Sequence, residues 1–415
     1  MNLYLFNAND SAATYGIGTY LNELTGALAG TEIRIHIVHL HADRPEFEIV
    51  TKELVEHWYI PDVCNKSTAS GLVLKLEDYY RNVVYLLLLN MNDTKDLVFH
   101  FNYNHSYWLA KRLKEVFTCQ TECTVHFMKW SQELLGNVTR LQAIKTKPPD
   151  KRTAHEQLLI DTDEYESRQY KASDRVIALS DDMKQFLNSA YRLEPEKVTI
   201  IPNGLHDLNS EKGTDRYKLR KKWHLSENEL SILFVGRLHP VKGISFLIRA
   251  FRKVLEQMPD CRLIIAGGGH DDRYRKEATD ISRNVTFTGL LEKKDLLELY
   301  QIADVGVIPS LYEPFGLVAL EMMMHELPIV STSTSGLNEV VDEQCGLKIP
   351  VIEYQDRVEI DVNLLAEKIL YLLHHPDEAK TMGQNGRKRY LQKYTSEVFR
   401  TNMLNLYRSL YAVYS

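Results

Sequence analysis

Two short segments in the second half of the chain carry charged residues that could bind the phosphates of a ligand. The first, residues 234–243, reads FVGRLHPVKG and begins within an apolar run. We expect a strand to end at Gly236 and a helix to begin at Gly243, and Arg237 and Lys242 lie in the turn between them. Two cations beside the free N–H groups of a helix N-terminus suit a diphosphate, because arginine offers a fork of donors and lysine a compact charge. Taken alone, the segment is equally compatible with a solvated turn.

The second segment, residues 310–321, reads SLYEPFGLVALE and adds two carboxylates to the same half of the chain. A proline fixes a turn, Gly316 lets the backbone approach a ligand, and a helix follows whose free N–H groups favour anions. Glu313 precedes this helix and Glu321 lies about two turns inside it, so we expect Glu313 near the reacting end of a ligand and Glu321 deeper. Because the run Leu317–Met324 is otherwise apolar, Glu321 should be partly buried and in need of hydrogen-bond donors. A ribose diol would supply them, and a core arginine or lysine is the alternative.

Apolar strands that alternate with amphipathic helices must position these residues. In the second half, strands are expected at Ser231–Val235, Arg262–Ala266, Val285–Thr288, Val305–Pro309 and Pro328–Ser331, and helices at Gly243–Gln257, Lys294–Ile302 and Leu317–His325. The first half repeats the pattern less cleanly, with strands at Asn2–Asn7, Ile33–Leu40, Leu97–Phe101, Thr121–Phe127, Arg175–Leu179 and Val198–Ile201. This alternation predicts an α/β protein with two facing Rossmann-like, doubly wound parallel sheets. Ligands of such sheets bind beyond the carboxyl ends of the strands, here in a cleft between the domains.

The chain divides into two expected domains and a tail. Residues 1–205 form the first domain and residues 206–393 the second, with the polar stretch Asp207–Asp215 as the linker. Residues 132–149 have weak periodicity and end at two prolines, so we interpret them as a loop with short helical pieces. The tail, residues 394–415, repeats apolar residues at helical spacing and therefore needs an apolar partner, so we expect it to pack back towards the first domain.

The composition is that of a globular protein with no bias towards nucleic acid. The 415 residues are too many for one core; 44% are hydrophobic, 26% are charged, and the formal net charge is −6. Five scattered cysteines, an odd number, favour reduced thiols in the cytoplasm. The chain begins with a strand-like run rather than a signal peptide, and its longest apolar run, Val83–Leu89, is too short to span a membrane. A basic stretch between Arg140 and Arg152 is interpreted as a solvated face, with docking to an anionic lipid or substrate as the alternative.

Together, the two charged segments resemble the C-terminal signature of glycosyltransferase family 4, the retaining GT-B enzymes. That family has a G-R-L-x-x-x-K-G turn followed by E-P-F-G, with a second glutamate eight residues after the first, and this chain keeps the order and the spacing. The matching residues are Gly236, Arg237, Leu238, Lys242 and Gly243, then Glu313, Pro314, Phe315, Gly316 and Glu321. Smaller matches are Ile201–Gly204, Ala266–Gly269, Phe287–Leu290, Gly336 and Glu339. The resemblance covers residues 175–339 well.

The resemblance implies a role for each matched residue. Arg237 and Lys242 would hold the diphosphate of a nucleotide sugar and offset the charge that builds on the departing nucleotide. Glu321 would bind the ribose hydroxyls, and Glu313 would hold the donor sugar. The other donor-binding groups would be backbone groups of Gly236, of Phe315, Gly316 and Leu317 at the sugar, and of Gly289 and Leu290 at the base.

The first half matches the family more loosely. The glycine-rich turn after the first strand reads Tyr15–Tyr20, where Gly16 and Gly18 would let backbone N–H groups approach phosphate and acceptor, although the adjacent glycine pair common in the family is absent. The family also places a histidine, often followed by aspartate, after an N-domain strand. His126 fits this position, but Phe127 follows it. His126 would hydrogen-bond the donor sugar and steady the charged transition state, and a purely structural histidine is the alternative.

One competing motif would bind a metal. Asp161 and Asp163 form the D-x-D pattern that holds Mn²⁺ and diphosphate in the other large glycosyltransferase fold. Here the pattern lies in Leu158–Tyr170, which has the character of a polar helix, and it does not follow an apolar strand. Because Arg237, Lys242 and a helix end would already offset the charge of the diphosphate, we expect no metal site and no cofactor beyond the nucleotide sugar itself.

The resemblance thus implies a cytoplasmic enzyme, peripheral to a membrane at most, that transfers a hexose from a nucleotide-diphosphate sugar. A UDP-sugar is favoured over GDP-mannose, and the first domain would bind a saccharide, lipid-linked or peptide acceptor. Transfer would be retaining and metal-independent, with the donor phosphate taking the proton of the acceptor. The alternatives are a GT-B sugar phosphorylase, a nucleotide-sugar epimerase and a non-catalytic sugar-binding protein. An NAD-dependent oxidoreductase is disfavoured, because the glycine run at 267–269 does not form G-x-G-x-x-G.

Overall fold

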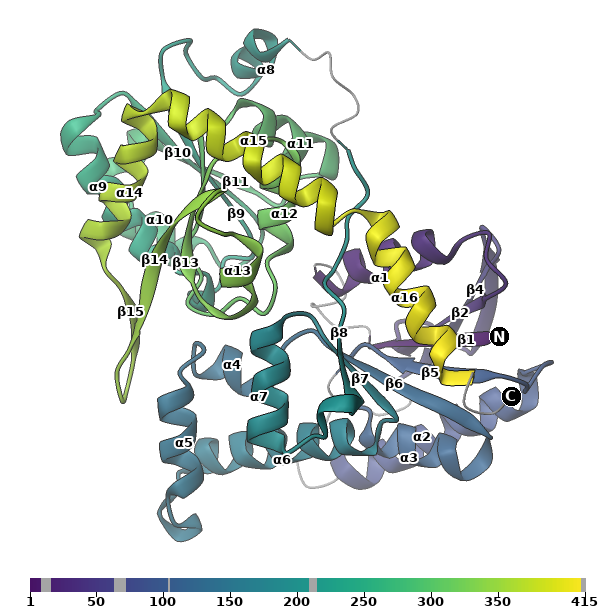
Figure 1. The fold of residues 1–415 in the computed structure, drawn as a ribbon. Helices are drawn as coiled ribbons and strands as arrows, with labels where there is room; N and C mark the ends of the chain where they lie inside the picture. Colours follow the sequence, from purple (N-terminus) through teal and green to yellow (C-terminus); the bar gives the residue numbers. More distant parts are fainter. Residues whose placement is uncertain (9–15, 63–71, 104, 209–214, 412–415) are drawn as a thin grey trace. The chain divides into compact units, whose positions relative to one another are not determined.

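The computed structural model describes residues 1–8, 16–62, 72–103, 105–208 and 215–411 (Figure 1). By their internal contacts these residues fall into two compact units. Unit 1 comprises residues 1–129, 149–203 and 399–415, and unit 2 comprises residues 130–148 and 204–398. The sequence placed residues 130–148 in the first domain, whereas their contacts place them in unit 2.

Unit 1 is built on an eight-stranded sheet in the order β3-β4-β2-β1-β5-β6-β7-β8. The strands are β1 (Asn2–Ala8), β2 (Arg34–Ala42), β3 (Glu48–Lys52), β4 (Val55–Pro61), β5 (Leu97–Phe101), β6 (Cys119–Val125), β7 (Arg175–Ala178) and β8 (Val198–Ile200). All neighbours are parallel except β3 and β4, which form an antiparallel hairpin at one edge. The parallel strands therefore end along one edge of the sheet, where a ligand of such a fold binds.

Helices cover both faces of this sheet. They are α1 (Gly16–Leu28), α2 (Leu72–Asn90), α3 (Tyr107–Val116), α6 (Ala154–Ala172), α7 (Asp181–Tyr191) and α16 (Ser396–Tyr411). Figure 1 shows α1 and α16 on one side of the sheet and α2, α3 and α6 on the other. Phe399, Met403 and Tyr407 of α16 share one buried apolar cluster with Leu24 of α1 and Ile35 of β2. The removal of this apolar surface from water holds α16 against unit 1.

Unit 2 is built on a seven-stranded sheet in the order β11-β10-β9-β12-β13-β14-β15. The strands are β9 (Leu230–Val235), β10 (Cys261–Ala266), β11 (Val285–Gly289), β12 (Val305–Ile308), β13 (Ile329–Ser333), β14 (Gly346–Glu353) and β15 (Val358–Ile360). Neighbours are parallel except β14 and β15, which form an antiparallel hairpin.

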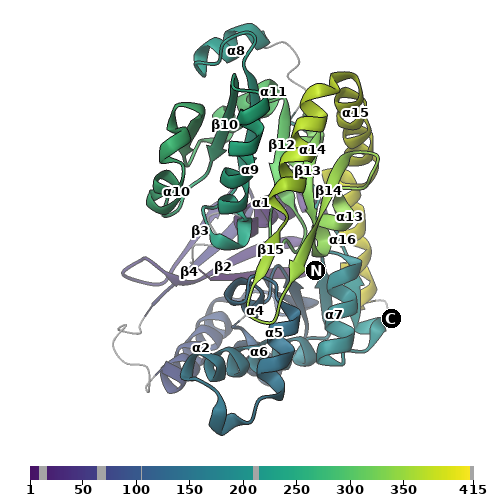
Figure 2. The same ribbon diagram turned by 90° about the vertical axis from the view of Figure 1, so that its left-hand side faces the viewer.

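The helices of unit 2 are α4 (Lys129–Glu133), α5 (Val138–Thr146), α8 (Arg216–Lys222), α9 (Ile244–Gln257), α10 (Asp272–Glu277), α11 (Lys293–Ile302), α12 (Leu317–Met324), α13 (Ser335–Val340), α14 (Val362–His374) and α15 (Pro376–Lys393). Figure 2 shows α9 and α14 side by side. Leu247, Phe251 and Val254 of α9 are fully buried in the main apolar cluster of the unit. None of the helices in the described ranges, in either unit, has the length and apolar content that spanning a lipid bilayer requires.

The Rossmann-like architecture expected from the sequence is confirmed in both units. Each expected strand is present, with bounds within two residues of the prediction. The antiparallel hairpins at the edges of the two parallel sheets were not predicted. The β3–β4 turn passes through Glu53 and Leu54 at positive φ, and most of β3 is exposed, so no apolar run marks this strand. The expected cleft between the domains stays a prediction.

Candidate functional site

The expected phosphate-binding residues lie along the carboxyl edge of the unit 2 sheet. Arg237 follows β9 and Glu313 follows β12, and these two strands are neighbours. The turn after β9 pairs with the glycine run after β10, since the N–H of Leu238 donates to the carbonyl of Gly268 at 2.8 Å. A side chain at Gly267 would put its Cβ 1.9 Å from the carbonyl oxygen of the turn after β9. The glycine run is thus explained by the close packing of two turns rather than by a dinucleotide.

Arg237 is a cation that is available to a ligand. Its side chain is half-buried at the end of β9. Within the described ranges of the chain, its guanidinium makes no hydrogen bond and no ion pair. A half-buried guanidinium has lost part of its hydration without gaining a partner, so an anion at this position would be favourable.

Lys242 and Glu313 converge from the two separate sequence segments. The ammonium Nζ of Lys242 lies 2.5 Å from Oε2 of Glu313, and the hydroxyl of Ser310 donates to the same oxygen at 3.2 Å. The two side chains are only 22% and 15% exposed. The backbone explains the approach, because a Cβ at Gly243 would lie 1.8 Å from the carbonyl oxygen of Pro309. The sequence assigned the two residues to different parts of a donor, and the structure shows them paired with each other.

Glu321 receives its hydrogen bond from a residue that the sequence did not single out. The hydroxyl of Tyr300, on α11, donates to Oε2 of Glu321 at 2.6 Å, and the phenol is buried. His325 stacks on Tyr300 with ring centroids 5.4 Å apart, and its Nδ1 lies 2.8 Å from the carbonyl oxygen of Glu321. Burial, and next the Glu321 carboxylate, raise the pKa of Tyr300 well above its usual value, so the phenol stays a donor. The sequence suggested a ribose diol as the source of hydrogen-bond donors to Glu321, with a core arginine or lysine as the alternative; in the structure a tyrosine supplies one of these donors.

The start of α12 presents backbone rather than side chains. Phe315 is 4% exposed and packs against Tyr394 with ring centroids 6.0 Å apart. Gly316 adopts φ 105°, and a Cβ there would lie 2.9 Å from Leu337. The first N–H groups of α12, including that of Leu317, precede the first intrahelical bond and are open to an anion.

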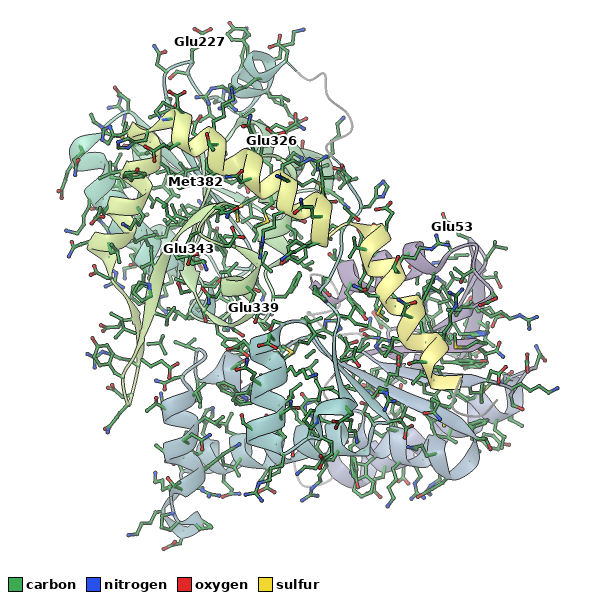
Figure 3. The ribbon with its side chains drawn as sticks, in the orientation of Figure 1. Glu53, Glu227, Glu326, Glu339, Glu343 and Met382 are labelled. Atoms are coloured by element: carbon green, nitrogen blue, oxygen red, sulfur yellow. The ribbon has the colours of Figure 1, made fainter. Side chains whose placement is uncertain are left out.

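The loop expected at a nucleotide base lies at the end of β11. Gly289 has φ 72° and accepts a hydrogen bond from the N–H of Gly267 at 3.0 Å, which ties it to the glycine run after β10. Leu290 is 63% exposed. Gly289 thus joins the row of turns that holds Arg237 and Glu313. Of the smaller matches to the family, Glu339 lies on α13, as labelled in Figure 3, and its carbonyl accepts from Arg389 at 2.7 Å.

The expected residues of the first half lie at the carboxyl edge of the unit 1 sheet. His126 follows β6, and its Nε2 is 3.2 Å from Oδ1 of Asn102, which follows β5. Tyr20 of α1 packs edge-on against the imidazole at 4.6 Å between centroids. Burial lowers the pKa of His126 to about 3. Gly16 begins α1 and Gly18 lies in its first turn; among the described residues a Cβ at Gly16 would meet nothing within 4 Å, so their packing does not require glycine there.

A buried polar network behind His126 was not predicted. His100 Nε2 lies 2.7 Å from the hydroxyl of Thr124, which lies 3.2 Å from the hydroxyl of Tyr20. His100 Nδ1 lies 2.8 Å from the hydroxyl of Tyr407 on α16. The members come from four separate elements, and no motif joins them. The one hint in the sequence was the presence of polar residues, such as His100 and Thr124, inside short strands that are otherwise expected to be buried.

Residues 130–148 pack within unit 2 beside the loop that carries Glu313. Trp130 contacts Tyr312 with ring centroids 5.8 Å apart, and a Cβ at Gly136 would lie 2.6 Å from that of Tyr312. The side-chain amide of Asn137 donates to the carbonyl of Tyr354, in the β14–β15 turn, at 2.7 Å. Figures 1 and 2 show α4 and α5 beside this hairpin. The expected loop with short helical pieces contains two helices: α4 contacts the tyrosine next to Glu313, and the residue before α5 is bonded to the hairpin.

The D-x-D residues do not act as a pair. Asp161 accepts a hydrogen bond from Gln157 at 2.7 Å on the exposed side of α6, whereas Asp163 is 3% exposed and accepts from the hydroxyl of Tyr191 at 2.8 Å. Residues two apart on a helix do not face the same way. Across the described ranges, no three His, Cys, Asp or Glu side chains group closely enough to hold a metal ion.

Two protein families match the chain in adjoining halves. The family described as Glycosyltransferase Family 4 matches residues 14–207, and the family described as Glycosyl transferases group 1 matches residues 215–389. An uncharacterised glycosyltransferase of Methanocaldococcus jannaschii is 37% identical over 177 residues, which is 41% of this chain and 45% of the relative. A D-inositol 3-phosphate glycosyltransferase of Mycobacteroides abscessus is 29% identical over 257 residues, 58% of this chain and 55% of the relative. The chain thus spans about half the length of the curated relatives it matches.

Solved structures share the fold over the whole chain. A sucrose-phosphate synthase of Thermosynechococcus elongatus superposes with a TM-score of 0.78 at 24% identity and covers 100% of both chains. An Anabaena protein solved in complex with UDP-glucose gives a TM-score of 0.70 at 16% identity and covers 99% of this chain and 100% of its own. At such identities the likeness shows a common fold, the two-sheet GT-B architecture expected from the sequence.

Proposed function

The chain belongs to the family 4 glycosyltransferases, and from that premise we propose that it transfers a hexose from a nucleotide-diphosphate sugar to a saccharide, lipid-linked or peptide acceptor. The observation that carries this proposal is the contact of Lys242 with Glu313, which joins the segments after the neighbouring strands β9 and β12; Arg237 lies in the segment after β9. Two cations and a carboxylate along the same edge of one sheet suit a ligand that is anionic at one end and rich in hydroxyls at the other.

Donor binding would rearrange the Lys242–Glu313 pair. Arg237 and Lys242 would take the diphosphate, and Glu313 would then accept hydrogen bonds from hydroxyls of the sugar. Glu321, already held by Tyr300, would accept from the ribose, and the free N–H groups at the start of α12 would approach the phosphate and the sugar. The role of each residue is carried over from the family and is part of the proposal.

The reaction we propose is retaining and needs no metal. The acceptor oxygen would form a bond to the anomeric carbon on the face from which the diphosphate leaves, and the acceptor proton would pass to an oxygen of that phosphate. Negative charge would build on the nucleotide and positive charge on the sugar. Removal of one fixed group that is aimed at developing charge costs about 3–4 kcal/mol. Arg237, Lys242 and a helix end would therefore stabilise the departing diphosphate in place of a divalent ion.

For the donor we favour a UDP-sugar. One structure that shares the fold holds UDP-glucose, whereas a relative from Corynebacterium glutamicum, 30% identical over 203 residues, is named as GDP-mannose-dependent. The base would be met by backbone groups near Gly289 and Leu290, which carry no side-chain code for uracil or guanine. A GDP-sugar is therefore the competing donor.

A binding and turnover screen tests these statements. Melting would be followed with UDP, GDP, ADP and their sugars, and a donor at a hundred times its Kd should add about 2.7 kcal/mol of stability. Release of nucleotide from the favoured donor, even slowly and without acceptor, would separate an enzyme from a sugar-binding protein. Sugar 1-phosphate formed only with added phosphate would indicate a phosphorylase, and an epimerised donor would indicate an epimerase. EDTA should leave turnover intact, and strict dependence on Mn²⁺ would contradict the metal-free mechanism.

A further inference from the structure

Asn102 occupies a fully buried position directly after β5, beside the imidazole of His126. Its backbone N–H donates to the carbonyl of Phe6 at 3.1 Å, which fixes the residue to β1. Its side-chain Nδ2 faces the carbonyl oxygen of His100 at 3.5 Å, and its Oδ1 faces Nε2 of His126 at 3.2 Å. The amide is therefore oriented at both ends, with its oxygen towards the histidine.

This orientation determines which ring nitrogen carries the proton. An amide oxygen can only accept, so Nε2 of His126 must be the N–H donor. In a neutral imidazole the other nitrogen, Nδ1, then carries a lone pair. Within the described ranges, Nδ1 of His126 makes no hydrogen bond with the protein. It is thus an acceptor that is held in place and left available.

We propose that Asn102 is a positioning residue that holds His126 as the Nε2–H tautomer, so that Nδ1 can accept a hydrogen bond from a hydroxyl of the donor sugar. The proposal rests on the proposed function, which places His126 at the donor sugar. Asn102 itself need not touch either substrate. The family resemblance did not point to this residue, because the motif that suggested His126 covers only its neighbours in sequence at the end of β6, and Asn102 follows β5.

The surroundings of the ring keep it neutral without a carboxylate. Burial lowers the pKa of His126 to about 3 and that of His100, on β5, to about 3. The group on α1 that faces the ring is Tyr20, whose phenol stays protonated because burial raises its pKa. Glu122, earlier on β6, has its pKa raised to about 8 by burial and is mostly uncharged near neutral pH. Phe127 stands where the family often has aspartate, so a neutral amide orients the ring in this chain.

Two substitutions at Asn102 separate a role in the tautomer from a role in packing. In Asn102→Asp, the carboxylate can accept the same Nε2–H bond but raises the pKa of His126. At high pH this variant should approach wild-type kcat, and as the pH falls kcat should drop because a second proton occupies Nδ1. In Asn102→Ala, the tautomer is released, and kcat should fall about tenfold at every pH, the scale of one lost hydrogen bond in the transition state. Wild-type kcat should show no such acid limb, since its imidazole stays neutral.

The profiles would be recorded with saturating donor from about pH 5.5 to about pH 9, the range in which a histidine titrates. Asn2→Ala is the matched control, because Asn2 is also buried and also donates to a backbone carbonyl, that of Lys95 at 3.0 Å, yet lies away from His126. It should lower stability without changing the shape of the profile. Equal, pH-independent losses in both Asn102 variants would overturn the proposal and leave Asn102 a packing residue.

A second comparison covers the case in which Asn102→Asp folds poorly. If Asn102 acts through His126, then Asn102→Ala should cost nothing further in a chain that already carries His126→Ala. Losses of kcat that multiply in the double variant would contradict the proposal. Wild-type protein that neither binds nor turns over any nucleotide sugar would instead remove the proposed function, so the two failures are distinguishable.

Discussion

The two candidate regions are assembled in different ways. In unit 2 the candidate residues come in two short segments, and the structure joins these segments directly through the Lys242–Glu313 pair. In unit 1 a single histidine is held by residues from separate elements: Asn102 after β5 and Tyr20 on α1. A site built from contiguous turns can be recognised in a sequence by its spacing, whereas a site built from isolated strand positions becomes visible only once the sheet is assembled.

The largest effect should come from breaking the contiguous site. Lys242→Ala or Glu313→Ala should each lower kcat by about 10²–10³, the cost of removing a group aimed at charge in the transition state. Without donor, each residue is the other's partner, so the double variant should lose little more stability than either single one. With donor bound, the two would contact different parts of it, so their losses in kcat should multiply. Turnover would be measured with saturating donor, and binding by melting.

The matched control for this pair is Lys276→Ala, which removes the same charge from an exposed position on α10. It should leave kcat unchanged. Turnover close to wild type in Lys242→Ala or Glu313→Ala would remove that residue from the mechanism. Strictly additive losses of stability in the double variant, measured without donor, would contradict the pairing seen in the structure.

The glycines of the two regions sharpen the comparison. Gly243 has φ 68° and a backbone oxygen 1.8 Å from where a Cβ would stand, so Gly243→Ala should lower the free energy of unfolding by about 2–4 kcal/mol. In the part of the chain that the structure describes, Gly16 has no neighbour within 4 Å of such a Cβ, so Gly16→Ala should change the free energy of unfolding by less than about 1 kcal/mol. Urea unfolding of both variants measures the difference.

Activity gives the glycine comparison a second readout. If the turn at Gly16 serves substrate binding, Gly16→Ala should raise KM without lowering stability. Gly243→Ala should lower stability and activity together. Equal destabilisation by the two substitutions would contradict the packing difference that separates the regions.

The sequence predicted what depends on local pattern. Strand bounds, the turns after β9 and β12, and the apolar face of α16 all follow from spacing and periodicity. It did not predict what depends on assembly. Tyr300 lies on an ordinary amphipathic helix, and only the docking of α11 beside α12 brings its hydroxyl to Glu321. Residues 130–148 have weak periodicity because part of their packing is one ring contact and one amide, at Trp130 and Asn137, rather than an apolar face.

The smallest expected effect concerns the buried network of unit 1. Glu122 is fully buried on β6, and neither carboxylate oxygen has a hydrogen-bond partner in the described part of the chain. Burial raises its pKa from 4.5 to about 8; Arg175 opposes the rise, Asp174 adds to it, and His100 lies 3.8 Å away. The folded state therefore holds this proton more tightly than the unfolded state. Its contribution to stability is complete below about pH 4.5 and is lost as the pH rises through 8.

The buried histidines change stability with pH in the opposite direction to Glu122, and they do so at lower pH. The pKa values of His100 and His126 are about 3 in the fold against 6.5 outside it, so their effect is to cost stability as the pH falls below about 6.5. Between pH 6.5 and pH 8 the Glu122 effect stands alone among these three, and the free energy of unfolding should fall by about 1–2 kcal/mol. Glu122→Gln, which keeps the shape but cannot ionise, should flatten this slope in urea unfolding. Glu196→Gln, at an exposed position in the same unit, should leave it unchanged. If the slope persists in Glu122→Gln, the buried network of unit 1 does not hold a proton on Glu122. The comparison with the ion pair of unit 2 would then lose its basis.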